Sequence, residues 1–263
     1  MRRPKRLVKP VAPAVVLVPE MERFARTELL LGKEKLGRLN NAQVLVVGLG
    51  AVGGHCVEAL VRAGVGSLRL VDFDIIRLSN VNRHIWATEQ TIGRAKAEVA
   101  LERLTSINPA VKISLFNGFA APETFEQVFT QKFAVAVDAI DSLNPKVQFL
   151  AECWRREQCV VASMGAATRT DPLKVRTADI FDTRVCPLAA RMRRRLKELG
   201  MGRGVRCVYS EEVQDVHTLS QDAPPEPGDY LRGRPRRRLG SLSTLTGIFG
   251  LTLAQLAIDQ IIS

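Results

Sequence analysis

The feature that most constrains this chain is a glycine-rich turn between two apolar segments. Residues 43–54 read Gln-Val-Leu-Val-Val-Gly-Leu-Gly-Ala-Val-Gly-Gly, and an apolar segment, 56–65, follows at once. The chain then enters a second apolar run that ends in Leu70-Val71-Asp72. This order predicts a strand, a tight turn, a helix, and a second strand with an acidic residue at its tip.

The three spaced glycines of the turn have separate physical tasks. Gly48 permits the turn, Gly50 lets the backbone approach a phosphate, and Gly53 lets the helix pack on the strand. The N–H groups that begin the helix then face the anion. Asp72 lies 22 residues past Gly50, a spacing that suits binding of a ribose hydroxyl. The glycines alone fit any Rossmann cofactor, so a dehydrogenase stays open at this point.

Strands and helices alternate over most of the chain. Further strands are expected at 111–116, 133–138 and 159–162, and helices at 93–106, 122–131 and 145–158. This alternation predicts an α/β fold with a Rossmann-like, doubly wound, mostly parallel sheet. Ligands of such sheets bind at the carboxyl ends of the strands, which places the glycine turn, Asp72 and residues 138–141 on one rim.

The pattern divides the chain into three parts. Residues 1–22 form a flexible basic extension, 23–165 the nucleotide-binding domain, and 166–263 a smaller, basic substrate region. In the last part we expect a short strand near 173–177, a basic helix at 187–199, a strand at 205–209, a mobile loop at 217–238 and a terminal helix at 242–262.

Positive charge is concentrated in the last third of the chain. The net charge is +11 over 263 residues. Such clusters are typical of proteins that bind RNA, although a solvated helix face plus a basic loop gives the same pattern. The clustered cations are Arg191, Arg193, Arg194, Arg195 and Lys197, then Arg232, Arg234, Arg236, Arg237 and Arg238.

The cysteines and the apolar C-terminal segment indicate the cellular compartment of the protein and whether it contacts a membrane. Five cysteines lie scattered, with no Cys-x-x-Cys pair, which argues against a disulfide framework or a structural zinc site and favours a reducing cytoplasm. Residues 242–262 are long enough to span a membrane, but their Ser, Thr and Gln content and Asp259 favour a buried terminal helix. Membrane contact through this helix is the less favoured alternative.

A polar loop after the second strand carries residues suited to cleaving a polyphosphate. Arg and Lys neutralise charge that develops on phosphate, and an Asp holds the metal that bridges phosphate oxygens. Each residue also has a plainer interpretation: Asp74 as a turn cap, the asparagines as loop residues, Lys96 as a solvated lysine. The candidates are Asp72, Asp74, Ser79, Asn80, Asn82 and Arg83, followed by Lys96 and Asp141.

These residues stand in motifs that resemble the ubiquitin-activating-enzyme-like superfamily, whose members adenylate carboxylates with ATP and magnesium. The motifs are Gly48-Leu-Gly-Ala-Val-Gly, Leu70-Val-Asp-Phe-Asp74, Leu78-Ser-Asn-Val-Asn-Arg83, Gly93-Arg-Ala-Lys96 and Asp138-Ala-Ile-Asp-Ser142. Within it, the chain most resembles the tRNA threonylcarbamoyladenosine dehydratases. That closer resemblance lies in Arg23-Phe24, Pro145-Lys146, Pro187-Leu-Ala-Ala, Arg206-Cys-Val-Tyr-Ser-Glu-Glu212, Gly240-Ser241 and Phe249-Gly250, so it reaches the C-terminus.

The resemblance implies a role for each motif. Ala51 and its flanking glycines would form the phosphate loop, and Asp72 would bind the ribose. Residues 79–83 and Lys96 would contact phosphates, while Asp141 binds Mg²⁺ with Ser142 beside it. Arg26 stands where related adenylyltransferases use an arginine that reaches across a homodimer. The resemblance is also compatible with a sulfur-relay protein as a partner.

Three functions follow, from different classes. The leading hypothesis is ATP-dependent cyclisation of threonylcarbamoyladenosine beside the tRNA anticodon, with the basic clusters gripping the RNA. The second is adenylation of the C-terminus of a ubiquitin-like sulfur-carrier protein, which usually comes with paired Cys-x-x-Cys zinc ligands that this chain lacks. The third is a nucleotide-sensing or RNA-binding module without catalysis.

Overall fold

The computed structural model describes residues 20–213 and 239–263, and its centre is one seven-stranded sheet. The strand order is β3-β2-β1-β4-β5-β7-β6, and every pairing is parallel except that of β6 with β7. The predicted α/β, mostly parallel sheet is therefore confirmed. The strands are β1 (Gln43–Val47), β2 (Ser67–Val71), β3 (Lys112–Phe116), β4 (Val135–Asp138), β5 (Val160–Ser163), β6 (Val175–Asp179) and β7 (Arg206–Ser210).

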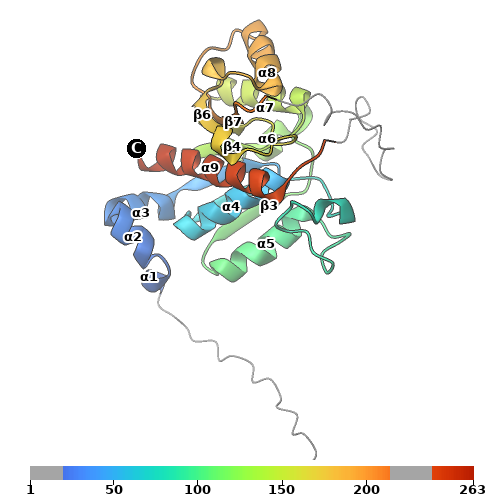
Figure 1. Ribbon diagram of the computed structural model, residues 1–263. Coiled ribbons are helices and arrows are strands. Elements are labelled where there is room, and N and C mark those ends of the chain that lie inside the picture. The colour runs from blue at the N-terminus through green and yellow to red at the C-terminus, as the bar shows by residue number, and fades with distance from the viewer. Residues whose placement is uncertain (1–19, 214–238) are drawn as a thin grey trace, which may run out of the picture.

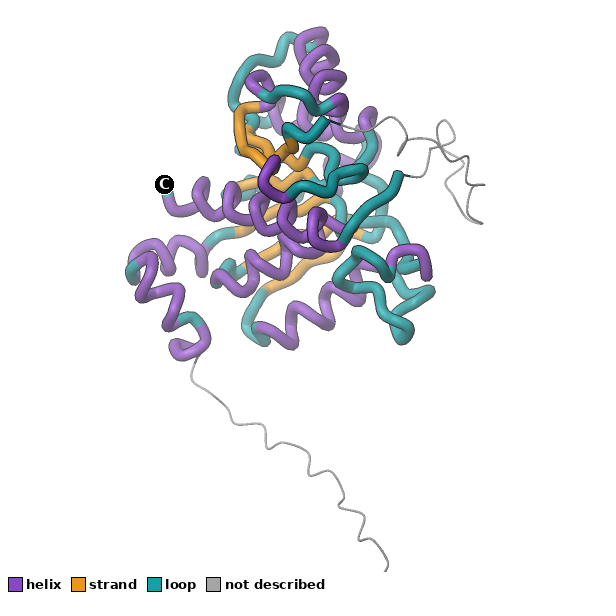
Figure 2. Tube along the Cα trace, viewed as in Figure 1, coloured by secondary structure: helices purple, strands orange, loops and turns teal. Residues whose placement is uncertain are grey.

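Helices cover both faces of the sheet (Figures 1 and 2). One apolar cluster joins the sheet to α3 (Lys33–Asn41), α4 (Ala51–Ala63), α5 (Lys96–Ile107) and α9 (Ser243–Ile262). The other joins it to α6 (Phe125–Val128), α7 (Leu143–Arg155) and α8 (Pro187–Glu198). Two-sided burial explains why β4 and β5 read as continuous apolar runs rather than alternating ones.

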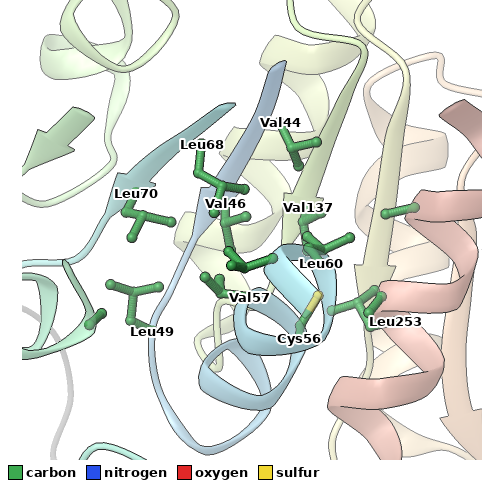
Figure 3. Packing of buried hydrophobic residues seen from close by; sticks show 14 of the residues in the cluster. Val44, Val46, Leu49, Cys56, Val57, Leu60, Leu68, Leu70, Val137 and Leu253 are labelled. Atoms are coloured by element: carbon green, nitrogen blue, oxygen red, sulfur yellow. The ribbon is translucent and has the colours of Figure 1, made fainter. Parts of the chain in front are cut away.

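The C-terminal helix α9 closes the first of these cores. It lies beside α4, and Leu253 packs near Cys56 and Leu60 (Figure 3). The approach is so close that a Cβ on Gly250 would lie 2.4 Å from the Val52 carbonyl oxygen. By length and composition α9 is a candidate membrane span, but 56% of its most apolar window is buried in the protein. The packing supports the predicted terminal core helix.

Several boundaries differ from those expected. Helix α4 begins at Ala51, ahead of the apolar segment at 56–65, and includes Gly53 and Gly54, which pack against neighbouring backbone and side chains. The helix expected at 122–131 is a 3-10 turn (Pro122–Thr124) and the short α6, which ends where Phe129 leaves helical geometry and stacks on Phe149. Strand β6 begins at 175, because residues 172–174 form a 3-10 turn after Asp171.

Three helices that precede β1 were not predicted. Two of them are short, α1 (Glu20–Arg23) and α2 (Ala25–Leu31), and the third is α3. Residues 1–19 and 214–238 lie outside the described residues, so the predictions for the basic extension and the loop at 217–238 stay predictions. Strands β6 and β7 extend the same sheet as β1 to β5. The proposed domain boundary at 165 likewise stays a prediction.

Candidate active site

The glycine turn joins β1 to α4 at the carboxyl edge of the sheet. Gly48 has φ +95°, and a Cβ there would lie 2.7 Å from the Ala139 carbonyl oxygen. A Cβ on Gly53 would lie 1.8 Å from the carbonyl oxygen of Gly48. Both positions therefore require glycine for folding itself.

Gly50 differs from the other two glycines, because the space beside it is open. It precedes Ala51 as the N-cap of α4, and no side chain caps the helix. A Cβ on Gly50 would meet one heavy atom within 4 Å in the described structure, Cε1 of His84 at 3.8 Å. An uncapped helix start beside open space suits an anion.

Asp72 ties this turn to the end of β2. Its Oδ2 accepts a hydrogen bond from the Leu49 backbone N–H at 2.6 Å, and its Oδ1 accepts one from the Asp74 N–H at 2.8 Å. Burial raises the pKa of this carboxyl, while the charge of Lys96 and the two backbone donors oppose the rise. Asp72 thus shapes the turn as well as standing at the predicted ribose position.

Lys96 is not the solvated lysine of the plainer interpretation. It is the first residue of α5, its side chain is only 6% exposed, and its Nζ lies 2.7 Å from Oδ2 of Asp74. Arg77 binds the other carboxylate oxygen of Asp74 at 3.2 Å. Asp74 therefore binds two cationic side chains, Lys96 and Arg77, in addition to any role in capping a turn.

The loop after β2 orders its polar residues through a 3-10 turn (Leu78–Asn80). Asn80 is buried, and its Oδ1 accepts from the Arg77 N–H at 3.0 Å. The backbone N–H of His84 donates to the Asn80 carbonyl oxygen at 2.9 Å. His84 was not among the predicted site residues, and its one signal in the sequence is its place directly after Arg83.

Asn82 and Arg83 lie at the exposed side of this loop. One guanidinium nitrogen of Arg83, Nη1, donates at 2.8 Å to both the Ser79 carbonyl oxygen and Oδ1 of Asn82. The Asn82 amide, Nδ2, donates to the Ser241 carbonyl oxygen at 3.1 Å. The loop therefore contacts the segment that leads into α9, a link of 159 residues in sequence.

The acidic pair after β4 separates into two roles. Asp138 is fully buried and its Oδ2 lies 2.8 Å from Nζ of Lys146, which is equally buried. That Nζ also donates to the Ile140 carbonyl oxygen at 3.1 Å, so it orders the turn that carries Asp141. Asp141 is exposed at the rim, with the Ser142 hydroxyl 3.4 Å from its Oδ1. Of the two carboxylates, Asp141 is the one exposed at the rim, and its role as the Mg²⁺ ligand stays a prediction.

The loop after β5 also reaches this rim. The Glu212 carboxylate accepts from the N–H groups of Thr170 and Asp171 at 2.9 Å each. The Thr168 N–H donates to the Gly240 carbonyl oxygen at 2.8 Å. One loop thus fixes the chain on both sides of residues 213–239, and sequence pattern gave no signal of it.

Arg26 is not brought to the glycine turn within one chain. It lies exposed on α2, and its neighbour Phe24 packs near Gly64, which follows the last turn of α4. The glycine turn is at the other end of this 13-residue helix, about 20 Å away at 1.5 Å per residue.

The basic helix α8 presents its arginines unequally. Arg191 and Arg194 are exposed. Arg195 is partly exposed and contacts Oδ1 of Asn144 at 3.4 Å. Arg193 donates to the carbonyl oxygen of Thr183 at 2.9 Å and to its hydroxyl, so it braces the chain before α8. Residues 236–238, the predicted second cluster of RNA contacts, lie outside the described part of the chain.

Burial holds Cys56 and Cys207 in the thiol form. All five cysteines are free, and burial raises the pKa of Cys207 to about 12 and that of Cys56 still further. The described residues contain no group of three or more His, Cys, Asp or Glu side chains that could hold a metal by themselves.

Comparison with known proteins places these features in a family. The ThiF family model matches residues 24–263. The tRNA threonylcarbamoyladenosine dehydratase of Bacillus subtilis is 37% identical over 209 residues, which cover 80% of this chain and 82% of that protein. The Escherichia coli enzyme of the same name is 37% identical over 199 residues, covering 73% and 74%.

Solved structures agree with the sequence comparison. The crystal structure of the Escherichia coli tRNA N6-threonylcarbamoyladenosine dehydratase in complex with ATP is similar to this structure with a TM-score of 0.81 and 32% identity. The match covers 94% of this chain and 97% of that one. A second crystal structure of the same enzyme contains AMP and has a TM-score of 0.80.

Proposed function

This chain belongs to the ThiF family, and from that premise we propose that it is an ATP-dependent tRNA threonylcarbamoyladenosine dehydratase. It activates the carboxylate of the modified adenosine and closes that group into a ring. The relatives that carry this name span most of the chain, and the similar solved structures contain ATP and AMP. The observation in this chain that carries the proposal is buried Lys96, held by Asp74 beside an uncapped helix start.

The proposed chemistry has two steps. First, a carboxylate oxygen attacks the α-phosphorus of ATP, and the bond between the α- and β-phosphates breaks, which releases pyrophosphate and leaves an acyl-adenylate. Second, the neighbouring amide or hydroxyl oxygen of the same nucleoside attacks the acyl carbon. The acyl–phosphate bond breaks, AMP leaves and a proton is lost. The nucleoside loses one water in total.

We assign binding of the ATP phosphates to the glycine turn at 48–53 and to two cationic side chains, Lys96 and Arg83. The N–H groups of Gly50 and Ala51 suit the phosphate chain, and Lys96 and Arg83 neutralise the charge that develops during its cleavage. Such chemistry depends mostly on positioning and charge neutralisation, so the ion pair with Asp74 that orients Lys96 contributes directly to catalysis. Asp72 is assigned to the ribose, and Asn80 and Asn82 order the loop.

Magnesium fits the residues at the rim. Mg²⁺ is usually held by one or two carboxylates together with substrate phosphates and water, so a site without a full protein cage is expected for it. Asp141 supplies one exposed carboxylate, and Ser142 lies next to it. When bound, the ion would neutralise phosphate charge.

The remaining partners belong to the same proposal. Exposed Arg191 and Arg194, with Arg195, are assigned to the tRNA backbone, as are Arg236, Arg237 and Arg238 from the sequence alone. A homodimer is expected, since Arg26 reaches no glycine turn in its own chain. Free cysteines and tRNA-modifying relatives favour the cytoplasm. A sulfur-relay partner rests on family resemblance alone.

One assay separates the three candidate functions. Pyrophosphate release is measured with ATP and either tRNA bearing threonylcarbamoyladenosine, a sulfur-carrier protein, or neither. The proposal expects release with the modified tRNA. Release only with the carrier protein would favour the adenylyltransferase, and ATP binding without release in any arm would favour a sensor.

A further inference from the structure

His84 is a buried polar residue that none of the roles above uses. Its side chain follows Arg83 in the loop after β2, and the residue is only 8% exposed. Its Nδ1 is shielded from solvent and has no hydrogen-bond partner in the described structure. Buried polar atoms nearly always have partners, so an imidazole placed this way calls for a reason.

The ring lies against the start of α4. Its Cε1, the carbon between the two ring nitrogens, is the one heavy atom of the described structure within 4 Å of a Cβ built on Gly50. The N-cap residue of this 13-residue helix is Gly50, which has no side chain with which to cap it. The Cε1 edge of the buried imidazole thus lies beside the start of α4.

The charge state of His84 follows from its surroundings. Burial lowers its pKa to about 2, with further contributions from the charges of Lys96, Arg83 and His55. The ring is therefore neutral at physiological pH and carries one N–H. Since Nδ1 is enclosed, Nε2 is the nitrogen through which the ring can reach a ligand.

We infer that His84 is a positioning residue for the phosphates of ATP, whose Nε2–H donates to a phosphate oxygen at the start of α4. The inference rests on the proposed function, because it takes ATP as the ligand of this site. Lys96 and Arg83 already bring two positive charges to this corner. A neutral donor adds a directed hydrogen bond without repelling them, and burial fixes its direction before ATP arrives.

The test compares two substitutions at this position in the full-length protein. His84→Leu removes the donor, and His84→Gln keeps an N–H of similar reach. Calorimetric titration should show a rise of roughly 10- to 100-fold in the Kd for ATP with His84→Leu, as expected for one hydrogen bond to a charged group. Affinity for adenosine should stay as in the wild type, and His84→Gln should recover most of the ATP affinity.

His55→Leu is the matched control. His55 is the second histidine with a buried, unpartnered nitrogen, Nε2, and its ring lies about 3.7 Å from a Cβ built on Gly247 of α9 rather than on the glycine turn. It should leave ATP affinity unchanged.

The outcomes are distinguishable. Unchanged ATP affinity in folded His84→Leu, or an equal loss of ATP and adenosine affinity, overturns the inference, since the second result indicates a structural role. If His84→Leu unfolds, His84→Ala, which also removes the donor, takes its place. A ratio of ATP to adenosine affinity far below the wild-type value in His84→Ala, together with normal adenosine binding, supports phosphate contact, and a wild-type ratio overturns the inference. Wild-type protein that binds no ATP contradicts the proposed function itself.

Discussion

Gly50→Ala isolates the role of the glycine turn in binding from its role in folding. Among the described residues, apart from its two chain neighbours, the added methyl group would meet only the ring of His84, at the ordinary contact distance of 3.8 Å. Gly50 has φ −70°, so it is not in the left-handed region that favours glycine, and its backbone is extended. The folded protein therefore has room for this Cβ, but the methyl group would occupy the space that we propose for a phosphate of ATP.

The two effects have different sizes. Alanine is a poorer N-cap than glycine, and the smaller entropy of its unfolded state offsets part of that loss, so the free energy of unfolding should change by less than about 1 kcal/mol. A phosphate pushed away from the helix start would lose at least two charge-assisted hydrogen bonds, worth about 3 kcal/mol or more together. The Kd for ATP should then rise more than about 100-fold.

Gly53→Ala is the contrasting variant. Its Cβ would lie 1.8 Å from the Gly48 carbonyl oxygen, so the backbone must move by more than an ångström. We expect a loss of about 3 kcal/mol or more in stability, which lowers Tm by more than about 6 °C.

Thermal unfolding followed by circular dichroism, and ATP titration by calorimetry, measure both variants. Gly50→Ala should melt near the wild-type Tm and bind ATP poorly. Wild-type ATP affinity in that variant would refute the argument that phosphate approaches the backbone here, and a Tm loss as large as that of Gly53→Ala would refute the reading of open space beside Gly50.

Three further outcomes are expected. Lys96→Ala and Asp141→Ala should each keep the fold but slow pyrophosphate release by roughly 10²–10³, and near-normal turnover in steady-state assays would remove that residue from the catalytic set. The double variant Arg191→Ala with Arg194→Ala should flatten the dependence of tRNA affinity on salt in filter-binding titrations while ATP affinity stays normal; an unchanged slope would place the RNA elsewhere. Because His84 has a folded-state pKa of about 2, against about 6.5 when unfolded, the unfolded state binds one more proton below pH 6.5. As pH drops below 6.5, this group should lower the free energy of unfolding by up to about 1.4 kcal/mol per pH unit. Urea titrations between pH 6.5 and 4.5 should show a shallower pH dependence for His84→Gln than for the wild type. Identical slopes in both proteins would contradict burial of His84 as a neutral ring.

Local pattern was sufficient for the strands and helices between residues 43 and 116, although it missed α1 to α3. The run at 43–54 combines a β-branched strand, a turn that needs φ above zero at Gly48, and a helix start, and each of these is a property of a few neighbouring residues. The strand at 112–116 and the basic helix α8 were predicted for the same reason. The antiparallel entry of β6 depends on pairing with β7, some 30 residues later, which no local pattern encodes.

Side-chain partners were the harder part. A lysine on a helix is usually solvated, yet Lys146 is buried because Asp138 on the neighbouring strand meets it. Arg193 has the same sequence signal as Arg194, but Thr183 is within reach of only the first in the described structure. His84 lies in a polar loop, yet it is only 8% exposed and its ring lies beside Gly50 of the glycine turn. Such pairings arise from the assembled sheet, so residue spacing could not reveal them.

The most direct test of the account is a reaction of purified protein with ATP, Mg²⁺ and tRNA that bears threonylcarbamoyladenosine, followed by mass spectrometry of the nucleosides. We predict a product nucleoside lighter by one water, with one AMP and one pyrophosphate formed for each molecule converted. An unaltered nucleoside under conditions in which the protein is folded and binds ATP, or AMP and pyrophosphate formation that needs a carrier protein instead of tRNA, would contradict the central claim.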